Sequence, residues 1–265
     1  MCLVNFRRSR DMGLTVHLTK TLKTTSETIP LAFALTLGGG ERKGIMGASG
    51  SGKTTLLRMI AGLIRPDSGI IRWNQQIWYD ENHWVVPNKR KVGLMFQHHA
   101  LFPHLTVEEN IRYGAMKGCD VQELLHMGEL EKRRNHYPFQ LSGGERQRVA
   151  LLRTLAYKPE ILLLDEPFNA LDRGTKTRLL SWVQEIFEYW KVTLLMVSHE
   201  NSELDSLCTE ICSVEDLRAL HKKWEKMSEG RNPKTYGAIN TGGVSPLAGT
   251  YVWELPSEKP ERLYV

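Results

Sequence analysis

The stretch "GASGSGKTT", residues 47–55, constrains this chain more than any other feature. It satisfies the pattern G-x-x-x-x-G-K-[ST], follows a short apolar run and precedes a helical pattern, which is the context of a phosphate-binding loop. Its glycines let backbone N–H groups close on the α- and β-phosphates of a nucleotide, while Lys53 reaches the β- and γ-phosphates and the Thr54 hydroxyl ligates Mg²⁺. The alternative is a glycine-rich turn with an incidental lysine. We expect nucleotide contacts from Gly47, Ala48, Ser49, Gly50, Ser51, Gly52, Lys53, Thr54 and Thr55.

The run "ILLLDE", residues 161–166, predicts the second half of a nucleotide site. Four apolar residues predict a buried strand, and two carboxylates follow at its carboxyl end. Asp165 would hold Mg²⁺ through water, and Glu166 could accept a proton from the attacking water. An Asp-Glu pair after an apolar run is often only a solvated strand end, but its pairing with the phosphate loop favours catalysis.

The apolar pattern predicts an α/β fold of the P-loop NTPase type, with a mainly parallel sheet flanked by helices. Short runs rich in Val, Ile, Leu and Met are typical of parallel strands covered on both faces. They occupy residues 42–46, 91–96, 161–165 and 192–198, and helices are expected at 53–61, 145–157 and 174–190. Partial alternation over 14–40 predicts an N-terminal antiparallel β subdomain. Helical spacing broken by Gly and Pro predicts a small α-helical insert at about 102–140.

Two further polar residues follow predicted strands, Gln97 after "KVGLMF" and His199 after "VTLLMVS". If the four runs share one parallel sheet, these residues, the phosphate loop and the Asp165–Glu166 pair emerge at its carboxyl edge. Open α/β sheets bind ligands at that edge. We therefore expect Gln97 and His199 to assist catalysis, with Gln97 also near the metal.

The stretch "LSGGERQRVALLRTLA", residues 141–156, places a Ser-Gly-Gly turn before an amphipathic helix. Free N–H groups and the positive end of the helix dipole make such a helix start a potential phosphate site. The chain would then hold two phosphate-binding elements, one at Lys53 and one at Ser142, Gly143 and Gly144.

Together these motifs resemble those of the ATP-binding cassette ATPases, in the family's order over about residues 14–200. "GASGSGKT" is similar to Walker A, Gln97 to the Q-loop glutamine, "LSGGERQRVALLRTLA" to the signature, and "ILLLDEP" to Walker B. "NALD" at 169–172 resembles the D-loop, and His199 the switch histidine. The resemblance implies a head-to-tail dimer in which ATP on one phosphate loop is capped by Ser142, Gly143 and Gly144 of the other copy. It implies Glu166 as general base, Gln97 and His199 arranging water and metal, and Thr54, Gln97 and Asp165 around Mg²⁺.

Within the family, "NKRKVGLMFQHHALFPHLTVEENIRYG" looks most like importer subunits of the molybdate, sulfate, polyamine or maltose type. The resemblance implies a separate integral membrane permease that docks near Gln97 to Leu105, and a solute-binding protein. His98, His99 and His104 could instead form a metal site, although solvated or interface histidines are the commoner case. The rival functions are an exporter or lipid-transport ATPase, a soluble nucleic-acid-associated ATPase, and a binding module that does not hydrolyse ATP.

The chain also departs from the family pattern. The family stacks adenine on an aromatic residue near the end of the first strand, and "LTKTLKTT" offers only His17 as a weak substitute. We assign residues 12–213 to the ATPase domain and 214–265 to a C-terminal extension of unknown role. The extension is either loosely ordered or a regulatory or docking element. Residues 218–227 could form a basic helix near lipid head groups, and 250–255 could form a strand.

Composition limits which partners, cysteine chemistry and cellular location we expect. The net charge of +5 permits anionic partners without establishing them, and no nucleic acid is expected because the cassette is single. Cys2, Cys119, Cys208 and Cys212 form no Cys-x-x-Cys pair, and of these only Cys208 and Cys212 could share a helix face, so we expect reduced thiols rather than a metal site. The sequence has no signal-peptide core and no run long enough to span a membrane. We expect a peripheral ATPase at the cytoplasmic face of the inner membrane.

Overall fold

The structure of the protein is a computed structural model, which describes residues 13–23, 28–96, 101–169 and 171–228. Backbone contacts divide the chain into two compact units, Met1–His221 and Lys222–Val265. In the second unit the described residues, 222–228, form the end of helix α7 (Val214–Ser228). All the elements that carry the predicted motifs lie in the first unit.

An antiparallel sheet of four strands begins the first unit. Its strands are β1 (Gly13–Lys23), β2 (Thr28–Gly38), β4 (Ser68–Trp73) and β5 (Gln76–Tyr79), in the order β2-β1-β4-β5. In the β1–β2 pair Leu18 lies opposite Phe33, and both side chains are buried. The predicted N-terminal antiparallel subdomain is therefore confirmed, and it is larger than predicted because β4 and β5 return to it.

A parallel sheet of five strands forms the centre of the same unit. Its strands are β3 (Arg42–Met46), β6 (Val92–Met95), β7 (Ile161–Asp165), β8 (Leu194–Ser198) and β9 (Glu210–Ser213), in the order β6-β7-β8-β3-β9. The first four are the strands that the apolar runs predict. Since β3, β7 and β8 lie next to one another and run parallel, their carboxyl ends reach one edge of the sheet.

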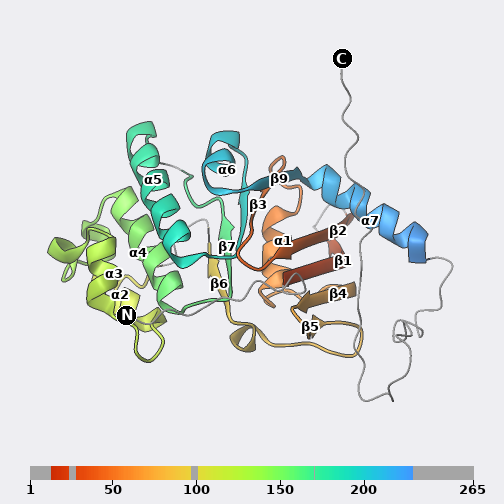
Figure 1. The fold of residues 1–265 in the computed structure, drawn as a ribbon, viewed down its shortest axis with the longest axis horizontal. Coiled ribbons are helices and arrows are strands. Elements are labelled where there is room, and N and C mark those ends of the chain that lie inside the picture. Colours follow the sequence, from red (N-terminus) through yellow and green to blue (C-terminus); the bar gives the residue numbers. More distant parts are fainter. Residues whose placement is uncertain (1–12, 24–27, 97–100, 170, 229–265) are drawn as a thin grey trace. The chain divides into compact units, whose positions relative to one another are not determined.

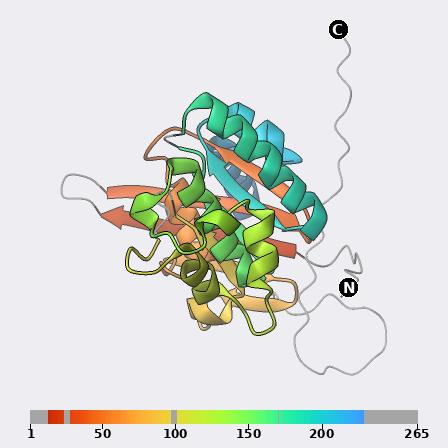
Figure 2. The same ribbon diagram turned by 90° about the vertical axis from the view of Figure 1, so that its left-hand side faces the viewer.

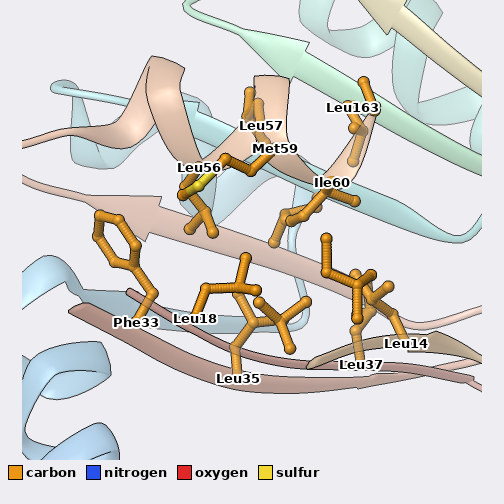
Figure 3. Packing of buried hydrophobic residues seen from close by; sticks show 14 of the residues in the cluster. Leu14, Leu18, Phe33, Leu35, Leu37, Leu56, Leu57, Met59, Ile60 and Leu163 are labelled. Atoms are coloured by element: carbon orange, nitrogen blue, oxygen red, sulfur yellow. The ribbon is translucent and has the colours of Figure 1, made fainter. Parts of the chain in front are cut away.

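Helix α1 (Lys53–Ile60) lies between the two sheets (Figure 1). Figure 3 shows Leu18, Phe33 and Leu35 of the antiparallel sheet pointing toward the apolar side chains of α1. From the other side, Leu163 of β7 and Ile45 of β3 join the same buried cluster. The apolar face of α1 is thus covered on both sides, which fixes the helix that begins at the phosphate loop.

Three helices cover the opposite face of the parallel sheet. They are α4 (Gly143–Ala156), α5 (Arg173–Trp190) and α6 (Asn201–Leu207). A second buried cluster joins Leu162, Leu164 and Met196 of the sheet to Leu151 of α4 and Val183 of α5. Strand residues therefore alternate between the two clusters, as expected for strands buried on both faces.

The region between β6 and β7 contains the short helices that the broken helical spacing predicts. They are α2 (Val107–Gly114), α3 (Val121–Met127), η2 (Glu131–Arg133) and η3 (Pro138–Gln140). Thr106 and Glu109 form a capping box that begins α2. A third buried cluster packs these helices on α4, on the side that faces the viewer in Figure 2.

A buried arginine, Arg90, directly follows the turn η1 (Pro87–Lys89) in the first unit. Arg90 is 0% exposed, and its guanidinium donates to the carbonyl oxygens of Val85, Met59, Ile60 and Trp78. Burial lowers its pKa to about 10. Four carbonyl acceptors make this buried cation tolerable, since an unpartnered one would be very costly.

The fold class expected from the sequence is confirmed: a parallel sheet with flanking helices, an antiparallel β subdomain and helices between β6 and β7. One detail was wrong, because Cys208 follows α6 and Cys212 lies in β9, so they do not share a helix face. Burial raises the pKa of Cys208 to about 12 and that of Cys212 to about 11, so both thiols stay protonated at neutral pH. Among the described helices none is long and apolar enough to cross a membrane.

Candidate functional site

The phosphate loop, residues 47–52, joins β3 to α1. Gly50 and Gly52 have φ of 78° and 98°, in the left-handed region that favours glycine. A Cβ on Gly52 would lie 2.9 Å from Leu31 of the antiparallel sheet, so this glycine also permits close packing. The buried Ser51 Oγ has no hydrogen-bond partner in the described part of the chain. A buried hydroxyl oxygen without a partner inside a glycine-rich loop fits a phosphate-binding site.

Lys53 begins α1 and is 6% exposed. Its Nζ donates to the carbonyl oxygens of Gly47 at 2.7 Å and Ala48 at 2.9 Å. The ammonium group therefore lies over the start of the loop, held by two neutral acceptors. A phosphate is a stronger acceptor for an ammonium group than a carbonyl, because its charge assists the hydrogen bond.

Thr54 and Asp165 bring α1 and β7 together at the carboxyl edge of the sheet. The Thr54 hydroxyl donates to Asp165 Oδ1 at 3.0 Å, and Asp165 is only 5% exposed. Burial raises the pKa of this carboxyl, and the bond from Thr54 opposes that rise only in part. A divalent cation would compensate the buried charge, and oxygen ligands of this kind suit Mg²⁺. These two residues therefore fit the magnesium site predicted from the sequence.

Glu166 follows β7 in a left-handed conformation, with φ of 45°. Such a conformation is uncommon for residues other than glycine and is often found at functional sites. The Glu166 carboxylate accepts from Asn169 Nδ2 at 3.1 Å, and its other oxygen lies 3.7 Å from His199 Nδ1. The backbone N–H of Glu166 donates to Val197 of β8 at 3.0 Å. The turn thus aims the carboxylate at the end of β8, where His199 begins the next loop.

The structure brings together the residues at 47–55, 165–166 and 199, as the parallel strand order requires. Gln97 lies outside the described residues, as do His98, His99 and Ala100. No cluster of three or more His, Cys, Asp or Glu residues that could hold a metal occurs in the described ranges. His104 is exposed beside Phe102, with ring centroids 6.1 Å apart.

The remaining part of the predicted docking segment is held in place by a buried asparagine. Asn110 of α2 is 0% exposed, accepts from the Phe102 backbone and donates to the carbonyl oxygens of Phe102 and Leu105. The Phe102 ring packs on Tyr113 at 4.5 Å, and Arg153 lies 5.2 Å from its centroid. Tyr113 is 69% exposed, so an aromatic surface borders this segment.

The Ser-Gly-Gly turn begins α4. Ser142 Oγ accepts from the Glu145 backbone at 3.2 Å, and the Glu145 carboxylate accepts from the Ser142 backbone at 2.8 Å, which completes a capping box. Ser142 is exposed and Gly144 is buried. Within the described ranges no hydrogen bond or ion pair joins residues 142–144 to the phosphate loop. The turn is therefore structured as a helix start, with its exposed end available to another molecule.

Two contacts near the phosphate loop could not be predicted from the sequence motifs. Arg218 of α7 donates to the Ser51 carbonyl oxygen at 3.3 Å, and a Cβ on Gly47 would lie 2.8 Å from Val214. The loop is thus backed by the first turns of α7, in a region that the sequence left without a role. The sequence predicts a possible helix at 218–227, but it does not predict where that helix packs.

His17, the weak substitute for an adenine-stacking aromatic, does not serve that purpose. It is 6% exposed and its ring stacks on His221 of α7, with centroids 4.1 Å apart and planes at 11°. Burial, followed by the neighbouring His221, lowers the pKa of His17 from 6.5 to about 4. The ring is already covered by a helix of this chain and so is not open to a nucleotide base.

Comparison with known protein families agrees with this geometry. A family model described as "ABC transporter" matches residues 32–169. A probable sulfate/thiosulfate import ATP-binding protein of Chlorella vulgaris is 45% identical over 191 residues, which cover 68% of this chain and 78% of the relative. The sulfate/thiosulfate import ATP-binding protein of Synechocystis is 46% identical over 65% of this chain, and the molybdenum import ATP-binding protein of Methylococcus capsulatus is 41% identical over 70%.

The chain spans 50% and 54% of the length of the latter two relatives, so about half of each has no counterpart in the match. Among solved structures, a dimeric bacterial ABC transporter cassette is similar with a TM-score of 0.63 and 33% identity, covering 77% of this chain and 95% of that one. A dimeric post-hydrolysis state of the same cassette, bound to ADP and phosphate, is similar with a TM-score of 0.64 and 34% identity, covering 76% and 94%.

Proposed function

This chain belongs to the ABC transporter family, and from that premise we propose that it is the ATP-hydrolysing subunit of a transporter. The observation that carries the proposal is the group at the carboxyl edge of the parallel sheet. There the Glu166 carboxylate lies between Asn169 and His199. The hydrogen-bonded pair of Thr54 and Asp165 lies at the same edge of the sheet, as does the loop from β3 to Lys53. Phosphoryl transfer to water requires a general base, a site for a divalent cation and a loop that binds the phosphates. Glu166, the Thr54–Asp165 pair and the loop at 47–52 are the candidates for these three roles.

In the proposed reaction Glu166 accepts a proton from a water molecule as that water attacks the γ-phosphorus of ATP. The bond between the γ-phosphorus and the β-bridging oxygen breaks, and ADP and phosphate leave. Lys53 and the loop amides stabilise the charge on the phosphate oxygens, and His199 orients the Glu166 carboxylate. Thr54 and Asp165 would hold Mg²⁺, with Gln97 as a third candidate ligand. When bound, Mg²⁺ supplies neutralisation of the phosphate charge.

We further propose that the working form is a dimer of two such subunits. The similar solved cassettes are dimeric, and the exposed Ser142 lies at a helix start with no polar contact to this chain's phosphate loop in the described residues. The Ser142, Gly143 and Gly144 turn of one copy would contact the γ-phosphate on the other. This assignment gives the second phosphate-binding element a separate role.

The transported substrate is proposed to be an oxyanion of the sulfate, thiosulfate or molybdate class, since relatives at 41 to 46% identity carry those names. An integral membrane permease would dock on residues 97–105 and the adjacent Phe102–Tyr113 surface, at the cytoplasmic face of the membrane. A solute-binding protein would deliver the oxyanion to that permease. The permease that copurifies with the chain, reconstituted in vesicles with labelled sulfate and molybdate, tests this part of the proposal.

Glu166→Gln tests the catalytic part. The amide cannot accept the proton, so ATP should still bind while phosphate release stops, and the subunit should accumulate as an ATP-bound dimer in size-exclusion chromatography. Glu185→Gln, on the exposed face of α5, is the matched control. A Glu166→Gln variant that stays monomeric with ATP and releases phosphate at the wild-type rate would refute both the general base and the dimer.

A further inference from the structure

Four side chains form a network of hydrogen bonds and ion pairs next to the backbone of His199. They are Lys176, Ser198, Glu200 and Glu203. The Lys176 ammonium of α5 lies 2.7 Å from Glu200 Oε1 and 2.7 Å from Glu203 Oε1. The other oxygen of Glu203 accepts from Ser198 Oγ at 2.6 Å, and Ser198 Oγ accepts from the Glu200 backbone N–H at 3.0 Å. The residues on both sides of His199 are therefore tied to one lysine.

Most of this network is removed from water. Glu203 is 2% exposed, Ser198 is 1% exposed, and the Lys176 side chain is 15% exposed. A carboxylate at this depth needs a cation and hydrogen bonds to be stable. Glu203 has both, from Lys176 and from Ser198. The pKa of Lys176 is raised, because its bonds to Glu200 and Glu203 outweigh the opposing effect of burial.

The network also connects three elements. Ser198 ends β8, Glu200 is the residue directly before α6, Glu203 lies in the first turn of α6, and Lys176 lies in the first turns of α5. His199 is the single residue between Ser198 and Glu200, and its own side chain is 49% exposed and points toward Glu166. Because about half of this side chain is exposed, the backbone on either side of His199 helps to determine where its ring lies.

We propose that Lys176 is a positioning residue for ATP hydrolysis, which holds the Ser198–Glu200 backbone so that His199 reaches the Glu166 carboxylate. This inference rests on the proposed function, because it assumes that His199 acts in hydrolysis. The ion pairs of Lys176 are with Glu200 and Glu203, so it acts through Glu203, Ser198 and Glu200. The loss of such support typically misplaces a catalytic group by a fraction of an ångström to an ångström, which costs about 10- to 100-fold in rate.

The first experiment compares Lys176→Met, Lys176→Arg and the control Arg178→Met, which removes one exposed positive charge from the same helix. In the ATPase assay Lys176→Met should lower kcat about 10- to 100-fold with little change in the KM for ATP. Lys176→Arg should recover most of the rate, and Arg178→Met should match the wild type. Because Lys176→Met leaves a buried carboxylate without its cation, the pair Lys176→Met with Glu203→Gln provides a neutral and foldable form with the same expected loss.

The second experiment is a double-mutant cycle with His199→Ala. If Lys176 acts through His199, Lys176→Met should lower the rate of His199→Ala by less than about twofold. Equal loss in both backgrounds, or wild-type kcat in Lys176→Met, would overturn the proposal. If instead His199→Ala alone hydrolyses ATP normally, the proposed role of His199 fails, whatever Lys176 does.

A measurement that does not depend on ATP turnover distinguishes a failure of the Lys176 proposal from a failure of the proposed role of His199. Hydrogen exchange at the Glu200 amide, which donates to Ser198 Oγ, should accelerate at least tenfold in Lys176→Met and return in Lys176→Arg. Exchange in β7 should stay unchanged and so report an intact fold. Unaltered exchange at Glu200 in Lys176→Met would show that Lys176 does not hold this backbone, and the positioning proposal would be wrong.

Discussion

The buried pair of His17 and His221 predicts that the fold loses stability in mild acid. His17 is 6% exposed and stacked on His221, and its pKa is lowered from 6.5 to about 4 by burial and by the neighbouring ring. Folding therefore favours the neutral ring. The unfolded chain takes up a proton as the pH falls through 6.5, while the folded chain does so only near pH 4, so the stabilisation is complete above pH 6.5 and is lost toward pH 4.

The size of the effect follows from the two pKa values. One pKa unit corresponds to about 1.4 kcal/mol, so the full loss approaches about 3 kcal/mol. At pH 5 the linkage relation gives at most about 2 kcal/mol, a substantial part of the stability of a typical domain. Carboxylates also titrate in this range, so a variant is needed to isolate the contribution of His17.

Urea unfolding of the wild type and His17→Phe at pH 7 and pH 5, followed by circular dichroism, measures that contribution. Phenylalanine keeps a ring against His221 but cannot bind a proton, so its loss of stability between the two pH values should be smaller by about 1 to 2 kcal/mol. His83→Gln removes an exposed histidine and should behave as the wild type. Equal pH dependence in the wild type and His17→Phe would refute the linkage argument.

Two further substitutions test contacts that support the site. Arg90→Met removes the guanidinium hydrogen bonds to four backbone carbonyl oxygens. Two of these oxygens, those of Met59 and Trp78, keep a backbone N–H donor, and the other two lose their side-chain donor. The free energy of unfolding in urea should therefore fall by about 3 to 5 kcal/mol; a loss below about 1 kcal/mol would contradict this. Arg218→Met removes the bond to the Ser51 carbonyl, so the Kd for ATP should rise roughly fivefold by calorimetry, with kcat kept. Lys222→Met, four residues further along α7, is the matched control, and an equal rise there would argue against a specific contact.

The elements that the sequence predicts well are those whose signal is local. Strands β3 and β7 were predicted to the residue because each is a short apolar run between a polar loop and a motif. The α1 and α4 starts were predicted within two residues, since a glycine-rich turn precedes each helix. A parallel order then requires Asp165, Glu166 and His199 to meet at one edge, and they do.

Contacts between distant segments could not be predicted in this way. Strand β4 is separated from its partner β1 by more than forty residues, and β9 pairs with β3 over a still longer separation. Lys176 lies 27 residues from Glu203, and nothing in the spacing of either residue indicates the other. His17 was considered for a base contact from its place in the chain, but its burial depends on the position of α7.

Gly144 provides a test of why the Ser-Gly-Gly turn needs glycine. A Cβ on Gly144 would lie 2.6 Å from Cγ2 of Thr175 in α5, and Thr175 precedes Lys176. Gly144→Ala should therefore move α4 against α5 and lower ATP hydrolysis several-fold. Thr175→Ser removes the opposing methyl group and keeps the hydroxyl, so the double variant should recover the rate if packing is the reason. Continued loss of hydrolysis in the double variant, with ATP affinity kept, would instead indicate that a methyl group at this turn blocks the contact with the nucleotide of the second subunit in the proposed dimer.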